Sequence, residues 1–159
     1  MENKKETIEY KVMMLDRRNE STKFLFEKMD EQLQIYENAY ALEMSLLNGE
    51  PKQTFKVDDN QICIAFTKEY EVLGFSTVEF NPVSKYLFIE HIYVKPNLRK
   101  KGVFKSMYAR IEKMANDIGA DKICSFVFRS NIDSKKAHAK LGFSKRLIGF
   151  VKELCNDRK

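Results

Sequence analysis

The sequence predicts an α/β protein built on a mixed sheet, with a central, mostly antiparallel sheet and flanking helices. Two patterns indicate this class. Segments in which apolar and polar residues alternate are typical of strands, and segments in which apolar residues recur every three or four positions are typical of helices. They follow one another in the order β, α, β, β, β, α, β, α, β. Because helices separate the later strands, the pattern favours a mixed α/β sheet over a sandwich of two sheets.

The size and composition of the chain narrow the prediction further. A length of 159 residues suits one core and, without an internal repeat or a linker, residues 1–159 are expected to form a single domain. The 43% of hydrophobic residues is ordinary for a soluble globular protein. No apolar run approaches the ~20 residues that span a bilayer, and the polar start lacks a signal-peptide pattern. We therefore expect a cytoplasmic protein without a membrane partner.

The first half of the chain is expected to supply one strand, one helical region and a meander of three strands. Residues 7–15 alternate in polarity, which indicates a first strand. Ser21 is expected to cap a helical region that ends at Asn48–Gly49, either one long helix or two short ones joined at a bend. Short turns separate the next three strands and imply antiparallel neighbours. These strands are expected at residues 61–67, 72–80 and 86–94.

The second half is expected to alternate between helices and strands. A polar loop leads to a second helix, which Gly102 opens and Gly119 ends. A short apolar segment rich in strand-forming residues follows, then a third, short helix, and Gly142 delivers the chain into a last strand. These three elements are expected at residues 123–128, 133–141 and 143–151.

The most specific segment of the sequence joins a strand end, a short basic loop and a helix start, over residues 92–104. The first N–H groups of a helix lack partners and carry the positive end of the helix dipole, so they bind phosphate well. Gly102 allows a ligand to approach the backbone closely. Arg99, Lys100 and Lys101 add attraction for a pyrophosphate. From the residues alone, a basic loop in front of an ordinary helix explains the segment equally well.

Two motifs identify a family resemblance. Val94, Pro96, Arg99 and Gly102 form the pattern V-x-P-x-x-R-x-x-G, and residues 131–143 match N-x-x-(A/S)-x-x-x-(Y/H)-x-x-x-G-F. In this order and with this spacing, they resemble the acetyl-CoA motifs of the GNAT N-acetyltransferase superfamily, over about residues 86–143. The resemblance implies the GNAT acyl-CoA N-acyltransferase fold. It also implies transfer of an acetyl group from acetyl-CoA to a primary amine by direct attack in a ternary complex.

The resemblance also implies which residues bind acetyl-CoA. Backbone amides of residues 99–104 would hold the pyrophosphate, and main-chain groups of Ile92 and Val94 would hold the acetyl carbonyl and the pantetheine arm. Asn131 would bond to the pantetheine. Phe104 replaces the usual Gly or Ala, so its ring has to point away from the pyrophosphate. The full expected set is Ile92, Tyr93, Val94, Arg99, Lys100, Lys101, Gly102, Val103, Phe104, Asn131 and Ser134.

Two residues are expected to move protons. His138 stands where family members most often carry a Tyr that protonates the departing thiolate, and an imidazole can do the same. The alternative is a His on the exposed side of a short helix. Glu90 is expected to be the base that deprotonates the amine, directly or through water. It shares the alternation of Ile92 and Val94 unless a β-bulge, frequent here in the family, swaps the faces. Its alternative is a solvated strand carboxylate.

The chain's partners are less sharply specified. The acceptor could be a small molecule, a polyamine, a peptide N-terminus, a lysine or an aminoacyl-tRNA. Only 16 residues follow Phe143, so the family's last strand is shortened, missing or supplied by a partner copy. The last of these would make a homodimer.

Other classes of function fit the sequence less well. Cys63, Cys124 and Cys155 lack CxxC spacing, so neither a metal site nor a disulfide framework is expected. The net charge of +5 is compatible with a nucleic-acid partner, but the cations gather where CoA phosphates need them and no nucleic-acid motif is present. A catalytically inactive acyl-CoA-binding regulatory protein of the same fold stays the main alternative.

Overall fold

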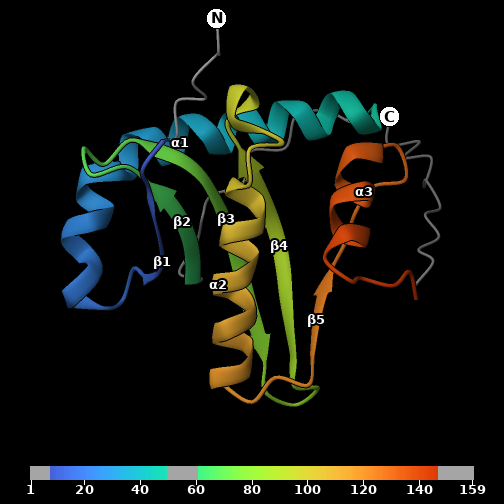
Figure 1. Ribbon diagram of the computed structural model, residues 1–159. Coiled ribbons are helices and arrows are strands. Elements are labelled where there is room, and N and C mark those ends of the chain that lie inside the picture. Colours follow the sequence, from blue (N-terminus) through green and yellow to red (C-terminus); the bar gives the residue numbers. More distant parts are fainter. Residues whose placement is uncertain (1–7, 50–60, 147–159) are drawn as a thin grey trace, which may run out of the picture.

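The computed structural model describes residues 8–49 and 61–146 (Figure 1). Within these residues the strands form one sheet in the order β1-β2-β3-β4-β5, antiparallel from β1 to β4 and parallel between β4 and β5. The expected mixed α/β sheet with flanking helices is confirmed. The elements are β1 (Lys11–Asp16), α1 (Glu20–Asn48), β2 (Gln61–Phe66), β3 (Val72–Asn81), β4 (Tyr86–Val94), the 3-10 turn η1 (Pro96–Leu98), α2 (Val103–Asp117), β5 (Lys122–Ser125) and α3 (Ile132–Lys140).

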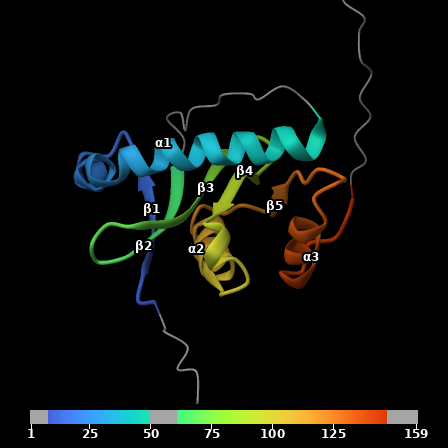
Figure 2. The ribbon, with the colours of Figure 1, turned by 90° about the horizontal axis from the view of Figure 1, so that it is seen from above.

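Helices cover both faces of the sheet. Helix α1 crosses one face, and α2 and α3 lie on the other (Figure 1, Figure 2). One apolar cluster lies between α1 and the sheet, and a second lies between the sheet and α2. In β2, Ile62 and Ile64 belong to the first cluster, whereas Cys63 and Ala65 belong to the second. Side chains alternate between the faces of a strand, so a strand that is covered on both faces is apolar throughout.

Helix α1 is one continuous helix of 29 residues. Its N-cap is Asn19 and not the expected Ser21, because the Asn19 Oδ1 accepts a hydrogen bond from the Ser21 backbone N–H at 3.0 Å. At its other end Gly49 adopts a φ of 70° and donates its N–H to the Ser45 carbonyl. The expected stop at Gly49 is confirmed, since a left-handed residue at this position ends a helix.

Three expected strands differ from the structure by more than one residue, and strand pairing explains two of these differences. β1 starts at Lys11 because this residue pairs with Phe66, the last residue of β2, and residues 8–10 form no strand. β5 ends at Ser125, well before residue 128, because its pairing with β4 stops at Ile89. Of the expected last strand, residues 143–146 form no strand, and residues 147–151 lie outside the described residues, as does Cys155.

A β-bulge in β4 sets the geometry of everything that follows. Thr77 of β3 pairs with His91, and Val78 pairs with Ile89, so the register between the two strands skips one residue of β4, Glu90. The extra residue swaps the faces of the strand. Ile89 and Ile92 therefore both face α2. In a regular strand, two residues three positions apart would face opposite sides of the sheet. The same position marks the end of the β4–β5 pairing.

Replacing Gly74 by Ala is expected to lower the free energy of unfolding by about 1–3 kcal/mol, the usual cost of overpacking. A Cβ at this position would lie 2.7 Å from the Tyr93 carbonyl oxygen and 3.3 Å from the Val94 Cα. Both atoms belong to the backbone of β4, so the strands would have to move apart. Denaturant unfolding monitored by circular dichroism measures the effect.

The control for this substitution lies two residues further along β3. Ser76 is buried, and its hydroxyl has no hydrogen-bond partner within the described part of the chain. Ser76→Ala removes a polar group whose burial is not compensated, so it is expected to leave stability unchanged or to raise it. Equal stabilities of the Gly74→Ala variant and the wild type would show that β3 and β4 tolerate the extra methyl group.

Candidate active site

The loop between β4 and α2 presents an open helix N-terminus. Gly102 is the N-cap of α2 with a φ of 93°, and Lys100 also has a positive φ of 63°. Among the described residues, no side chain caps this terminus and no acidic residue lies in its first turn. A Cβ built on Gly102 would meet nothing within 4 Å. The first N–H groups of α2, together with the exposed Lys100 and Lys101, therefore fit an anionic group such as a pyrophosphate.

The side chain of Arg99 turns away from this terminus toward α1. Its Nη2 donates to both carboxylate oxygens of Glu43 at 2.7 and 2.8 Å, and its Nε donates to the Val94 carbonyl at 3.0 Å. The guanidinium also lies 5.8 Å from the ring centre of Tyr93. Arg99 thus connects the loop to helix α1. A partly exposed ion pair of this kind contributes only about 0–1 kcal/mol to stability. A contact of the Arg99 side chain with phosphate stays a prediction.

Phe104 packs inward from the first turn of α2. It contacts the apolar cluster between the sheet and α2, and its ring centre lies 5.6 Å from that of His138 on α3. The ring therefore bridges α2 and α3. Val103, its neighbour, is buried in the same cluster.

His138 is buried, with only 8% of its surface exposed, so the alternative of an exposed helical histidine was wrong. Its ring lies between those of Phe104 and Phe143, with centre distances of 5.6 and 5.0 Å. Its Nδ1 lies 2.8 Å from the Ser134 carbonyl, and its Nε2 lies 3.0 Å from the Ser125 hydroxyl. Burial lowers the pKa of His138 below its ordinary value, and the bond to the Ser134 carbonyl opposes this in part.

Asn131 and Ser134 begin helix α3. The Asn131 Oδ1 accepts the Ser134 backbone N–H at 3.0 Å and so caps the helix. With its oxygen engaged in this way, Asn131 would contact a pantetheine through its amide nitrogen. The capping role and the expected ligand role are therefore compatible.

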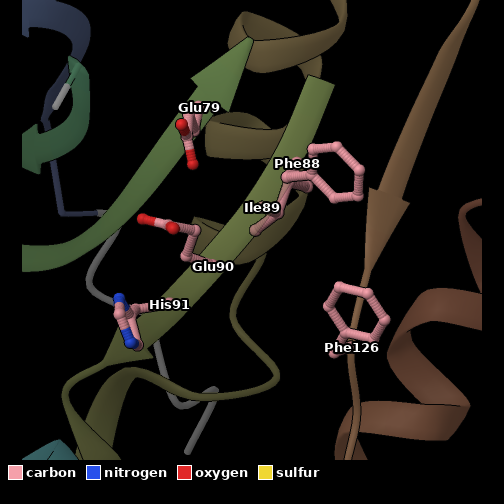
Figure 3. A pocket seen from close by; sticks show the side chains of 6 residues that line it. All are labelled: Glu79, Phe88, Ile89, Glu90, His91 and Phe126. Atoms are coloured by element: carbon pink, nitrogen blue, oxygen red, sulfur yellow. The ribbon is translucent and has the colours of Figure 1, made fainter. Parts of the chain in front are cut away.

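A pocket of about 420 Å³ lies on the α1 side of the sheet, beside the β-bulge. Figure 3 shows the carboxylates of Glu79 and Glu90 and the ring of His91 on one side of it, and the ring of Phe126 across from them. The bulge places Glu90 on the opposite face from Ile92 and Val94, which pack toward α2. The lining residues are Glu79, Phe88, Ile89, Glu90, His91 and Phe126.

His91 is the histidine that lines this pocket. Its Nδ1 lies 2.9 Å from the Thr77 hydroxyl, and its ring meets the Tyr40 ring edge-on at 5.4 Å. Burial lowers the pKa of His91. Burial, helped by the nearby Glu43, raises the pKa of Tyr40 to about 12, so this phenol keeps its proton.

The sequence alone predicted only part of this site. Glu90 was expected to take part in the reaction, but Glu79 and Phe126 reach the pocket from other elements and carry no motif. Tyr40 and Thr77, which contact His91, were not expected either. Glu43 and Ser125 were also missed, because each meets its partner across a long stretch of chain. In residues 8–49 and 61–146, no group of three or more His, Cys, Asp or Glu side chains could hold a metal ion. No helix in these ranges is long and apolar enough to cross a membrane.

The free energy of unfolding is expected to fall as the pH drops below about 6.5, the pKa of an unperturbed His. His91 and His138 both have lowered pKa values in the folded protein because they are buried. Below pH ~6.5 the unfolded chain therefore binds more protons than the folded one, and the stability that is fully present above this pH is lost as the pH falls through the folded-state values.

Denaturant unfolding at about pH 7.5 and about pH 5.5, on either side of the reference value, measures this dependence. A His138→Gln variant serves as the control, since it removes one of the two titrating groups and should show a shallower pH dependence. Equal slopes for the variant and the wild type would contradict the assignment to His138.

Comparison with known proteins places this geometry in context. A model of the acetyltransferase (GNAT) family matches residues 19–143. An aminoglycoside N(6')-acetyltransferase type 1 of Salmonella typhimurium strain LT2 is 32% identical over 74 residues, which are 45% of this chain and 50% of that protein. One from Serratia marcescens is 31% identical over 78 residues, 48% and 51% of the two chains. The chain thus spans about half the length of the curated relatives it matches.

Solved structures show the same fold at lower identity. A ribosomal-protein-alanine N-acetyltransferase from Brucella melitensis biovar Abortus 2308 aligns with a TM-score of 0.63 and 16% identity, covering 92% of this chain and 100% of that one. Aminoglycoside N-acetyltransferase AAC(6')-Iy, in complex with the bisubstrate analog CoA-S-monomethyl-acetylneamine, aligns with a TM-score of 0.57 and 20% identity, covering 92% of this chain and 99% of that one. At these identities the likeness shows the fold alone.

Proposed function

Because the chain belongs to the acetyltransferase (GNAT) family, we propose that it transfers the acetyl group of acetyl-CoA to a primary amine. In this proposal the amine attacks the thioester directly while both substrates are bound. One observation carries it. The second half of β4 leads through a short basic loop to the open N-terminus of α2, and the same half of the strand borders the acidic pocket. A phosphate-bearing acyl donor and an amine thus have adjacent sites on one strand.

The donor site is proposed along β4 and the loop behind it. β5 pairs only with residues 86–89 of β4, so within the described residues no strand covers that edge from Glu90 to Val94. Main-chain groups of Ile92, Tyr93 and Val94 on this edge would bind the acetyl group and the pantetheine arm as an added strand. The backbone from Arg99 to Phe104, with Lys100 and Lys101, would bind the pyrophosphate. Asn131 and Ser134 would line the other side.

The proposed reaction moves two protons. Acetyl-CoA supplies the activated thioester. Glu90, at the bulge, takes a proton from the incoming ammonium and frees the nitrogen lone pair. The nitrogen attacks the thioester carbon, and backbone N–H groups of β4 stabilise the oxyanion. As the C–S bond breaks, the nitrogen loses a second proton and the sulfur gains one, a transfer in which His138 takes part.

The acceptor is proposed to be a small amine that carries further positive charges. Glu79 and Glu90 place two carboxylates in one pocket, and Phe88 and Phe126 stack with a ring separation of 6.2 Å at its edge. Carboxylates next to aromatic faces attract amines through charge and cation–π contacts. The names of the curated relatives, aminoglycoside N(6')-acetyltransferases, support a polycationic acceptor of this kind.

Thiol release from acetyl-CoA tests this acceptor class with three amines: an aminoglycoside such as kanamycin, the polyamine spermidine, and benzylamine as a monoamine control. We expect kcat/KM to be at least ~10-fold higher for a polycation, since each added ion pair at a partly buried site is worth roughly 1 kcal/mol. Added salt should reduce this advantage. Equal kcat/KM values for all three amines would exclude a polycation-selective pocket.

A further inference from the structure

Ser125, His138 and the Ser134 carbonyl form a continuous hydrogen-bonded chain on the α2 and α3 side of the sheet. The His138 Nδ1 lies 2.8 Å from the Ser134 carbonyl oxygen, and its Nε2 lies 3.0 Å from the Ser125 Oγ. A carbonyl oxygen can only accept, so Nδ1 carries the proton and Nε2 offers its lone pair. The Ser125 hydroxyl therefore donates to Nε2, and its own lone pairs point away from the imidazole.

The position of Ser125 connects this chain to the proposed reaction centre. Ser125 is the last residue of β5 and pairs with Ile89, the residue before the bulge that carries Glu90. The next residue, Phe126, lines the acidic pocket. Ser125 thus lies where β5 stops covering the edge of β4, at the start of the segment proposed to bind the acyl donor.

His138 itself is poorly placed to meet a substrate. It is 8% exposed, its ring lies between two phenylalanine rings, and both of its nitrogens are hydrogen-bonded. Ser125 is half-buried and therefore more accessible to a ligand than the buried His138. A group bound along the edge of β4 would meet the hydroxyl before it meets the imidazole.

We infer that Ser125 is a catalytic residue that, together with His138, carries a proton from the attacking nitrogen to the departing sulfur. This inference rests on the proposed acetyl transfer. After the N–C bond forms, the Ser125 oxygen accepts the proton of the bound nitrogen while its own proton passes to the His138 Nε2. When the C–S bond breaks, Ser125 donates its proton to the thiolate and recovers one from Nε2. The imidazole ends neutral, and one proton has moved from nitrogen to sulfur.

The electrostatics of His138 suit this cycle. Burial keeps its pKa below the ordinary value, so the imidazole is neutral at physiological pH and Nε2 is ready to accept. The Ser134 carbonyl holds the Nδ1 proton and stabilises the transient imidazolium. The rings of Phe104 and Phe143 pack against the imidazole and contribute to its burial.

Replacing Ser125 tests the inference by kinetics and calorimetry. Ser125→Ala is expected to lower kcat by ~100-fold, the usual scale of proton-transfer catalysis, with the Kd for acetyl-CoA and the KM for the amine within about threefold of wild type. Ser125→Thr keeps the hydroxyl and suits a strand, so it should retain most of the activity. Ser84→Ala, in the exposed β3–β4 turn, is the matched control.

A double substitution separates a shared step from a structural contact. If the two residues act as one unit, Ser125→Ala combined with His138→Gln should be no slower than His138→Gln alone. A kcat for Ser125→Ala within threefold of wild type, or fully additive losses in the double variant, would overturn the inference and leave acetyl transfer standing. A wild-type protein that binds acetyl-CoA but releases no thiol with any amine would overturn both.

Discussion

Replacing Glu90 by Gln is expected to lower kcat by about 100-fold or more, the range of general base catalysis. Gln has the same shape but cannot take a proton from the incoming ammonium. Glu90 lies at the β-bulge, outside the pairing register of β3 and β4, so its replacement leaves the sheet intact. It shares the pocket with Glu79, which is expected to attract the amine but not to deprotonate it.

Steady-state thiol release with saturating acetyl-CoA measures this prediction. Glu79→Gln should mainly raise the KM of a polycationic amine, whereas Glu90→Gln should mainly lower kcat. Glu112→Gln, on the exposed side of α2, serves as the control for removal of one carboxylate. A Glu90→Gln variant with a kcat within threefold of wild type would assign the first proton transfer to another group at the pocket, with His91 as the nearest candidate.

Replacing Gly102 by Glu is expected to weaken acetyl-CoA binding by more than ~100-fold, because anion binding at a helix N-terminus depends on charge and on close backbone approach. The side chain would enter the open space above the α2 N-terminus. Its carboxylate would occupy the position of a phosphate and would repel the phosphates of CoA. The left-handed φ of 93° adds strain for any residue with a Cβ.

The matched control lies just beyond the other end of the same helix. Gly119 also has a positive φ, of 70°, and a Cβ there would also meet nothing within 4 Å. Gly119→Glu therefore imposes similar backbone strain without touching the proposed phosphate site. Isothermal titration calorimetry with acetyl-CoA should show wild-type affinity for this variant. Equal losses of affinity in both variants would assign the effect to backbone strain alone.

Local patterns predicted most of the fold. The apolar runs of β2 and β3 fit strands that are covered on both faces. Gly49 and Gly119, where helices were expected to end, adopt the left-handed geometry of helix C-termini. The family resemblance drawn from the two motifs is confirmed by the match over residues 19–143. These signals are local in the chain, so they can be read without knowing which elements meet.

What the sequence could not supply depends on pairing between distant segments. The last residue of β5 follows from where the β4 ladder stops, and that depends on the bulge at Glu90. The N-cap at Asn19 follows from a turn that returns its own N–H to the Asp16 carbonyl. The ion pair between Arg99 and Glu43 joins residues 56 positions apart. No spacing rule covers such contacts, since they depend on how the whole sheet is assembled.

The same reason limits the prediction of the site. His138 was identified from its motif, but its bond to Ser125 became visible only once α3 was placed against β5. Similarly, Glu79 shares the pocket with Glu90 only because β3 and β4 pair in a bulged register. The motifs therefore indicate which residues carry the chemistry, and the tertiary structure indicates which residues act together.

The most direct test of the central claim is to incubate the wild-type protein with acetyl-CoA and kanamycin and to follow CoA thiol and acetylated product together. The account predicts that both appear in equal amounts, that both require the protein, and that neither accumulates when the amine is omitted. Calorimetric binding of acetyl-CoA without thiol or acetylated product, over kanamycin, spermidine, benzylamine and a peptide with a free N-terminus, would contradict it. That result would mark the chain as an acyl-CoA-binding protein of the same fold without transferase activity.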